Sequence, residues 1–216
     1  MTIHKYIDFL SIKQNQINAR LFVSLAVFAD RETCPREETD IMERIEYLKR
    51  QVREIQDFPT KGILFRDLTT LFKDHRSVEL ATDLLVQRYA GKGITKVVGI
   101  ESRGFIFGSI LAYKLNAGFV PVRKKGKLPA DKISTTYTLE YGEDSIEMHR
   151  DALVPSDKVL LHDDLLATGG TTVAALKLIK ELGVTDIRVC FLLELEAMKG
   201  RDRIGSAHEV YSLLSY

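Results

Sequence analysis

The 216-residue sequence has little cysteine, almost no net charge and no long apolar run, and each absence excludes a class of protein. Its two cysteines, Cys34 and Cys190, lack metal-ligand spacing, which argues against a zinc site or a disulfide scaffold. The formal net charge of +1 gives no electrostatic reason to expect a nucleic-acid or membrane partner. The longest apolar candidate, Leu21 to Ala29, is too short to cross a bilayer. We therefore expect a cytoplasmic protein.

Residues 1–41 do not share the pattern of the rest of the chain. Their apolar run from Leu21 to Ala29 is compatible with a short helix, a strand or a signal-peptide core, although its polar lead is long for a signal peptide. We expect an N-terminal extension here, either disordered or read from an upstream start codon, and a single functional domain over residues 42–216.

Within residues 42–216, short apolar runs alternate with segments of helical periodicity. Strands are predicted at Lys96–Ile100, Phe119–Val122 and Ile187–Leu193, with an edge strand at Val210–Leu214. Helices are predicted over residues 42–56, 77–89, 105–115 and 171–182, the first of them opened by a capping box of Asp40 and Glu43. Continuous apolar strands alternating with helices predict an α/β fold with a doubly wound, mainly parallel sheet.

The most informative stretch runs from Lys158 to Thr172. It reads as a buried strand ending in Asp163 and Asp164, followed by a loop closing with Thr168–Thr171 and then a helix. The glycines of such a loop let the backbone approach a ligand, and the free N–H groups at the helix start favour a phosphate. The ionised carboxylates accept hydrogen bonds only, so they suit sugar hydroxyls or a metal ion. The stretch predicts a ribose phosphate site; the alternative is an ordinary strand-to-helix turn capped by threonines.

Three further segments carry polar groups at the ends of predicted elements. Glu101–Phe105 follows a strand and offers Arg103 to an anion, unless Glu101 and Arg103 simply pair on the surface. The basic run Arg123–Pro129 follows the next strand and is either an anion-binding loop or a solvated one. The threonine-rich segment of residues 130–144 suits a flexible β-hairpin lid, although an ordinary surface hairpin has the same composition.

His162 lies inside the signature strand, and we interpret it as a core residue. Side chains alternate along a strand, so His162 should point away from Asp163, which favours a core or edge histidine over a catalytic base.

The run Asp163–Thr171 resembles the phosphoribosyl-pyrophosphate signature of the type I phosphoribosyltransferases, and its Leu-Leu-Ala insert resembles the adenine phosphoribosyltransferase family. Four other segments resemble that family in the same order, so that the resemblance covers residues 42–216: Asp57–Asp67, Glu101–Phe105, Arg123–Pro129 and Leu139–Gly142. Lys61 departs from the family, which usually has proline there. The resemblance implies a type I phosphoribosyltransferase fold with a small N-terminal hood and a hairpin lid, a cis peptide near Glu101–Ser102, and a homodimer.

The resemblance also implies an activity, the conversion of adenine and phosphoribosyl pyrophosphate to AMP and pyrophosphate through an oxocarbenium-like transition state. It implies magnesium, held mainly by substrate oxygens and water rather than by a dedicated protein cage. The implied roles are ribose binding by Asp163 and Asp164, 5′-phosphate binding by Ala167, Thr168, Gly169, Gly170 and Thr171, pyrophosphate binding by Arg103 and Lys124, adenine binding by Leu64, Phe65 and Arg66, and assistance at the purine by Glu140.

Two other functions remain open from the sequence. The base could be xanthine or hypoxanthine, or the chain could sense phosphoribosyl pyrophosphate as a regulator without turning it over. Against the regulator, residues 1–41 show no helix-turn-helix pattern, the net charge is near zero, and Glu140 and the lid segment are retained.

Overall fold

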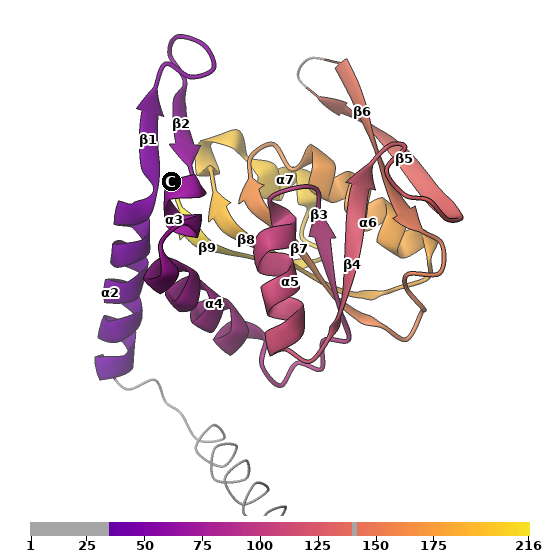
Figure 1. Cartoon of the computed structure of the whole chain (residues 1–216), viewed down its shortest axis with the longest axis horizontal. Coiled ribbons are helices and arrows are strands. Elements are labelled where there is room, and N and C mark those ends of the chain that lie inside the picture. Colours follow the sequence, from indigo (N-terminus) through magenta and orange to yellow (C-terminus); the bar gives the residue numbers. More distant parts are fainter. Residues whose placement is uncertain (1–34, 140–141) are drawn as a thin grey trace, which may run out of the picture. The chain divides into compact units, whose positions relative to one another are not determined.

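The structure, a computed structural model, describes residues 35–139 and 142–216 (Figure 1). The chain divides into two units, Met1–Glu43 and Arg44–Tyr216. The described strands all belong to the second unit, and so does the predicted ribose phosphate site. Glu140 lies outside the described residues.

A seven-stranded sheet forms the centre of the second unit, in the order β5-β6-β4-β3-β7-β8-β9. The five strands from β4 to β9 are parallel, as predicted, and β9 is the edge strand: β4 (Gly118–Lys124), β3 (Lys96–Ile100), β7 (Lys158–Leu166), β8 (Asp186–Glu194) and β9 (Glu209–Ser215). The other two, β5 (Lys132–Leu139) and β6 (Gly142–His149), form an antiparallel hairpin added beside β4. The predicted hairpin is therefore present.

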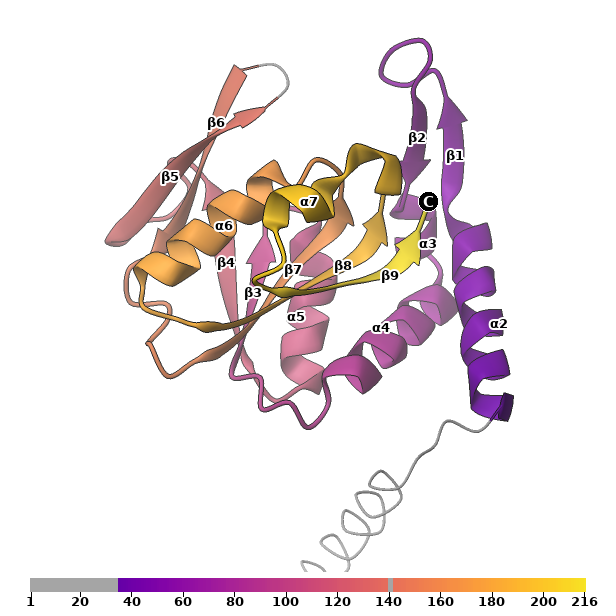
Figure 2. The same ribbon diagram turned by 180° about the vertical axis from the view of Figure 1, so that it is seen from behind.

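Helices cover both faces of the sheet, which confirms the doubly wound arrangement. α4 (His75–Tyr89) and α5 (Gly104–Lys114) lie on the face turned to the viewer in Figure 1. α6 (Gly170–Glu181) and α7 (Gly200–Ile204), preceded by the short helix η1 (Glu196–Met198), lie on the face seen in Figure 2. Fully buried aliphatic side chains join α6 to the sheet, among them Ile179, Leu161 and Val189. In the described ranges no helix is both long and apolar enough to cross a membrane.

The predicted helix over residues 42–56 is wrong at both ends. α2 runs from Pro35 to Gln51, so the expected capping residues Asp40 and Glu43 lie inside it. Residues 53–56 form β1 (Arg53–Gln56), which pairs antiparallel with β2 (Leu64–Asp67) and precedes α3 (Thr69–Phe72). The helical spacing of apolar residues continues past Gln51, but the backbone groups of β1 bond to β2 instead. This hairpin is the hood that the family resemblance implies.

His162 is a core residue, as predicted. It is fully buried on β7, and its Nδ1 lies 3.2 Å from the Sγ of the buried, free Cys190. Burial lowers the pKa of His162 to about 4, so the ring is neutral at physiological pH and takes no part in the charge balance of the neighbouring acids.

Candidate active site

The candidate site lies at the carboxyl end of β3, which has β4 on one side and β7 on the other. From β3 the chain crosses to β4 on one side, while β7 lies on the other side, and such a switch point opens a crevice at the carboxyl ends of the strands. The pairing of β3 with β7 ends at Gly99 and His162, so the residues that follow on each strand are free to face a ligand. A pocket of about 390 Å³ occupies this position.

Side chains from four segments line the pocket. They come from the turn after β3, the end of β4, the β5–β6 hairpin, and β7 with the start of α6: Glu101, Ser102, Arg103, Lys124, Tyr137, Asp144, Asp163, Asp164 and Thr171. Five of the predicted ligands therefore meet in one pocket: Arg103, Lys124, Asp163, Asp164 and Thr171. Tyr137 and Asp144 were not predicted, because nothing in the local sequence shows which hairpin face is turned inward.

Asp163 and Asp164 form an acid pair at the floor of the pocket, with Asp164 buried and Asp163 half-buried. The Asp164 N–H donates to Asp163 Oδ1 over 2.9 Å, and Asp164 is only 3% exposed. Burial raises the pKa of both carboxyls, and the Asp164 charge raises the pKa of Asp163 further. Arg103 Nε lies 2.8 Å from Asp164 Oδ2, which nevertheless makes no aligned hydrogen bond. The pair thus retains unused acceptor capacity for hydroxyls or a cation.

The turn after β3 brings Arg103 to the acids. Its Glu101–Ser102 peptide is cis, as the family resemblance implied. At Gly104, the first residue of α5, a Cβ would lie 2.9 Å from Asp163 Oδ1, so only glycine allows the helix to start this close to the acid pair.

Glu101 is occupied by the basic loop, so the alternative that it pairs with Arg103 is wrong. Its carboxylate accepts from Lys127 Nζ at 2.6 Å, from the Lys124 N–H at 2.9 Å and from Arg123 Nε at 3.2 Å. Burial alone would raise the pKa of Glu101, but these donors hold it at about 2. Glu101 therefore anchors a loop whose lysines remain exposed, and the Lys124 ammonium lies 3.0 Å from Asp144 across the pocket.

The predicted phosphate loop, Ala167–Gly169, leads directly into α6. Gly169 has a φ of +76°, the left-handed conformation that glycine adopts without strain, and no side chain caps the helix start. The N–H groups of the first turn therefore have no side-chain cap and point toward any bound anion.

The helix α7 packs directly against this loop, through Gly200 and Arg203. A Cβ on Gly169 would lie 2.7 Å from the Gly200 carbonyl oxygen, and one on Gly170 would lie 3.0 Å from Arg203 Nη1. Sequence reasoning missed Arg203. The sequence shows a polar run after Lys199, but no pattern in that run indicates that the Arg203 guanidinium lies beside the start of α6.

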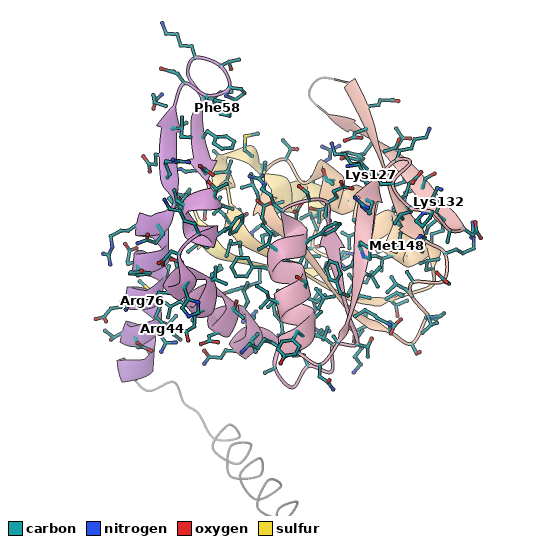
Figure 3. All side chains as sticks on the ribbon, viewed as in Figure 1. Arg44, Phe58, Arg76, Lys127, Lys132 and Met148 are labelled. Carbon is teal, nitrogen blue, oxygen red and sulfur yellow. The ribbon has the colours of Figure 1, made fainter. Side chains whose placement is uncertain are left out.

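The purine-side residues lie on β2 and outside the lining of this pocket. Phe65 packs edge-to-face with Phe58, their ring centroids 5.1 Å apart, and Figure 3 shows Phe58 at the tip of the hairpin. Arg66 pairs with Glu54, and its guanidinium lies 4.1 Å from the ring centroid of Tyr216. Arg66 therefore does not pair with its sequence neighbour Asp67.

Asp67 instead bonds to the other strand of the hood. It accepts from Arg53 Nε at 3.1 Å and from the Thr69 N–H at 2.9 Å. The Arg53 hydrogen bonds, with help from Thr69, lower the pKa of Asp67 to about 2. This ion pair fixes the end of β2 and so the direction in which Leu64, Phe65 and Arg66 are presented.

The fold and the pocket define the class of this protein, and comparison with known proteins agrees. Residues 67–212 match the phosphoribosyl transferase domain family. The chain is 54% identical to the adenine phosphoribosyltransferase of Bacteroides thetaiotaomicron over 79% of this chain and 97% of that one. A solved adenine phosphoribosyltransferase from Rhodothermus marinus is 46% identical, with a TM-score of 0.76 over 81% of this chain and 99% of that one.

A third relative was solved with a purine bound. The adenine phosphoribosyltransferase of Saccharomyces cerevisiae, complexed with adenine and an imino-altritol bisphosphate, is 36% identical, with a TM-score of 0.74 over 80% of this chain and 99% of that one. The chain belongs to the adenine phosphoribosyltransferase family.

Proposed function

We propose that the pocket between β3 and β7 is where this chain converts adenine and phosphoribosyl pyrophosphate to AMP and pyrophosphate in purine salvage. One observation carries the proposal: a pair of acids faces an arginine and a lysine in one pocket, and a phosphate loop adjoins the acids. That arrangement complements a ribose whose 5′-phosphate and 1-pyrophosphate point in different directions.

Asp163 and Asp164 are proposed to bind the ribose hydroxyls and to stabilise positive charge on the sugar ring. Both carboxyls have raised pKa values, because burial leaves their negative charge poorly compensated. A ring that gains oxocarbenium character supplies that compensation only in the transition state, which is the condition for accelerating the reaction.

The anionic ends of the substrate are proposed to bind on either side of the acids. The N–H groups and threonine hydroxyls of residues 167–171 hold the 5′-phosphate, with the guanidinium of Arg203 nearby. Arg103 and Lys124 hold the pyrophosphate, since they are the cations that line the pocket among the described residues.

Magnesium fits the same pocket as a companion of the substrate. When bound, it neutralises charge on the leaving pyrophosphate. The unused acceptor capacity of Asp164 Oδ2 suits a hydrated cation or the hydroxyls that it binds. Among the described residues no three histidine, cysteine or acidic side chains converge, so we propose substrate oxygens and water as the main ligands.

The purine is proposed to bind from the hood, with Phe65 stacking on the base and Leu64 and Arg66 defining its edges. Glu140, from the Leu139–Gly142 segment, is proposed to assist at the purine by accepting a proton or stabilising positive charge. The relative from Saccharomyces cerevisiae, solved with adenine, supports adenine as the base.

The choice of base can be measured directly. We expect kcat/KM with adenine to exceed that with hypoxanthine or xanthine by on the order of 10³-fold or more, because a site that hydrogen-bonds an amino group leaves groups unpaired with a 6-oxo base. Steady-state rates with the three bases, at saturating phosphoribosyl pyrophosphate and magnesium, test this. Equal rates with adenine and hypoxanthine would refute the assignment of adenine.

We also propose a homodimer that works in the cytoplasm. The outer face of α5 supports the dimer, because Ile106 is 39% exposed and Tyr113 is 82% exposed on that helix. The small number of cysteines supports a reducing compartment.

Residues 1–41 are proposed to be dispensable, with 42–216 the phosphoribosyltransferase domain. Because α2 begins at Pro35, a protein starting at Met42 loses the first two turns of that helix, whereas one starting at Pro35 keeps it whole. We expect both truncated proteins to retain kcat/KM within about twofold of the full chain, and to remain dimeric by sedimentation. A folded truncated protein that starts at Pro35 but is inactive would show that residues 1–34 are needed.

A further inference from the structure

Asp144 is an acid in a pocket that is expected to bind a polyanion. It lies on β6, and its carboxylate Oδ2 is 3.0 Å from the ammonium of Lys124. The same oxygen lies 3.4 Å from the hydroxyl of Tyr137, on the paired strand β5, and Asp144 Oδ1 accepts from the Ser145 N–H at 2.8 Å. Three contacts thus fix the carboxylate against the cation proposed to bind pyrophosphate.

Two of the other charged groups of the pocket, Glu101 and Arg103, already have partners of opposite charge. Glu101 holds Arg123 and Lys127, and Arg103 lies against Asp164. Lys124 is therefore the pocket cation whose partner is not part of the ribose or loop machinery. Its ammonium has one acidic neighbour within ion-pair distance in the described part of the chain, and that neighbour is Asp144.

The pair is placed to be broken by a competing anion. The side chain of Lys124 is 56% exposed and that of Asp144 is 23% exposed, and ion pairs with this degree of exposure are weak. A pyrophosphate carries several negative charges and binds a lysine more strongly than one carboxylate does. Its arrival displaces Asp144 from Lys124, and its departure restores the pair.

We propose that Asp144 competes with pyrophosphate for Lys124 and so weakens retention of the leaving group, which promotes its release. The proposal rests on the function assigned above, in which Lys124 binds pyrophosphate. It makes Asp144 a residue that tunes product affinity, although it touches neither the ribose nor the base.

Asp144→Asn tests the proposal, because asparagine keeps the shape and can still accept from the Ser145 N–H. The measured quantities are the inhibition constant of pyrophosphate against phosphoribosyl pyrophosphate, and the dissociation constant of ribose 5-phosphate, both with magnesium. We expect pyrophosphate to inhibit about two- to tenfold more tightly, the range expected for loss of one exposed ion pair and one like charge. Binding of ribose 5-phosphate should not change, since its phosphate lies at the other end of the pocket.

Glu143→Gln is the matched control. Glu143 precedes Asp144 on β6, carries the same charge and is exposed, but successive side chains on a strand point to opposite faces. It should leave the pyrophosphate constant unchanged, which separates a direct contact from a change in overall charge. In a Lys124→Gln background, Asp144→Asn should lose most of its effect, because the competing pair no longer exists.

Two outcomes would overturn the inference. One is an unchanged or weaker pyrophosphate constant in Asp144→Asn while the wild-type protein forms AMP. The other is an equal effect of Glu143→Gln. If the wild-type protein forms no AMP, the proposed function itself fails, and that result is distinct from either.

Discussion

Asp163→Asn should lower kcat/KM by about 10²- to 10³-fold and at the same time raise the stability of the fold. The activity falls because a neutral amide cannot stabilise positive charge on the ribose ring. The fold gains because Asp163 is held half-buried beside a second carboxylate, and the desolvation and the neighbouring charge raise its pKa well above 3.8. The amide oxygen can still accept from the Asp164 N–H, so the geometry of the loop is preserved.

The stability gain should depend on pH, with a sign set by the raised pKa of Asp163. A carboxyl with a raised pKa binds more protons in the folded state, so the wild-type protein loses stability as pH rises from about 3.8 through the folded pKa. Asp163→Asn removes that loss, so thermal unfolding should show a larger gain at pH 8 than at pH 5, of about 1–3 kcal/mol at the higher pH.

Asp151→Asn serves as the control for this prediction, because Asp151 is exposed and lies away from the pocket lining. It should change neither activity nor stability. An Asp163→Asn protein with wild-type activity, or with the same stability change at both pH values, would contradict the assignment of Asp163 to the ribose.

Gly200→Ala should weaken binding of phosphoribosyl pyrophosphate, although Gly200 is not one of the proposed ligands. A Cβ at Gly200 would lie 2.2 Å from the carbonyl oxygen of Ala167 and 2.6 Å from Leu166 Cδ1, far inside contact distance. α7 cannot easily move away, because Arg201 bonds the buried Glu194 at 2.6 Å. The loop must therefore shift. We expect the KM for phosphoribosyl pyrophosphate to rise tenfold or more, and stability to fall by about 1–3 kcal/mol.

The KM for adenine separates a loop effect from general damage, since the purine residues lie on the hood. It should change by less than about twofold in Gly200→Ala. Gly118→Ala is the matched control, because the Cβ there would lie 3.2 Å from the end of the flexible Lys96 side chain, which can move. Equal losses in both variants, or an unchanged KM for phosphoribosyl pyrophosphate in Gly200→Ala, would disprove the proposed coupling of α7 to the loop.

Local patterns predicted most of the sheet and the acid pair. Lys96–Ile100 is a strand at the predicted bounds, and Asp163, Asp164 and the glycine turn lie next to one another in the sequence, so their proximity needs no tertiary information. The end of α2 was missed because apolar spacing continues into β1, and only pairing with β2 decides between helix and strand there.

The pairing of the charged side chains could not be predicted from the sequence, for a different reason. Glu101 bonds Arg123 and Lys127, and Arg103 lies against Asp164, because the register of β3 with β4 and β7 brings those segments together. Arg203 reaches Gly170 and Asp144 reaches Lys124 by the same kind of long-range packing. Residue types and spacing indicate which groups are chemically able to bind a ligand, whereas the fold decides which of them meet.

The central claim is that the pocket transfers a phosphoribosyl group to adenine. Single-turnover formation of AMP, with enzyme in excess over labelled phosphoribosyl pyrophosphate and with adenine and magnesium present, tests it most directly. We predict one equivalent of AMP and one of pyrophosphate for each phosphoribosyl pyrophosphate consumed. The single-turnover rate constant should be at least 10²-fold lower with Asp163→Asn. Tight binding of phosphoribosyl pyrophosphate without AMP formation would contradict the claim and would indicate a sensor built on the same fold.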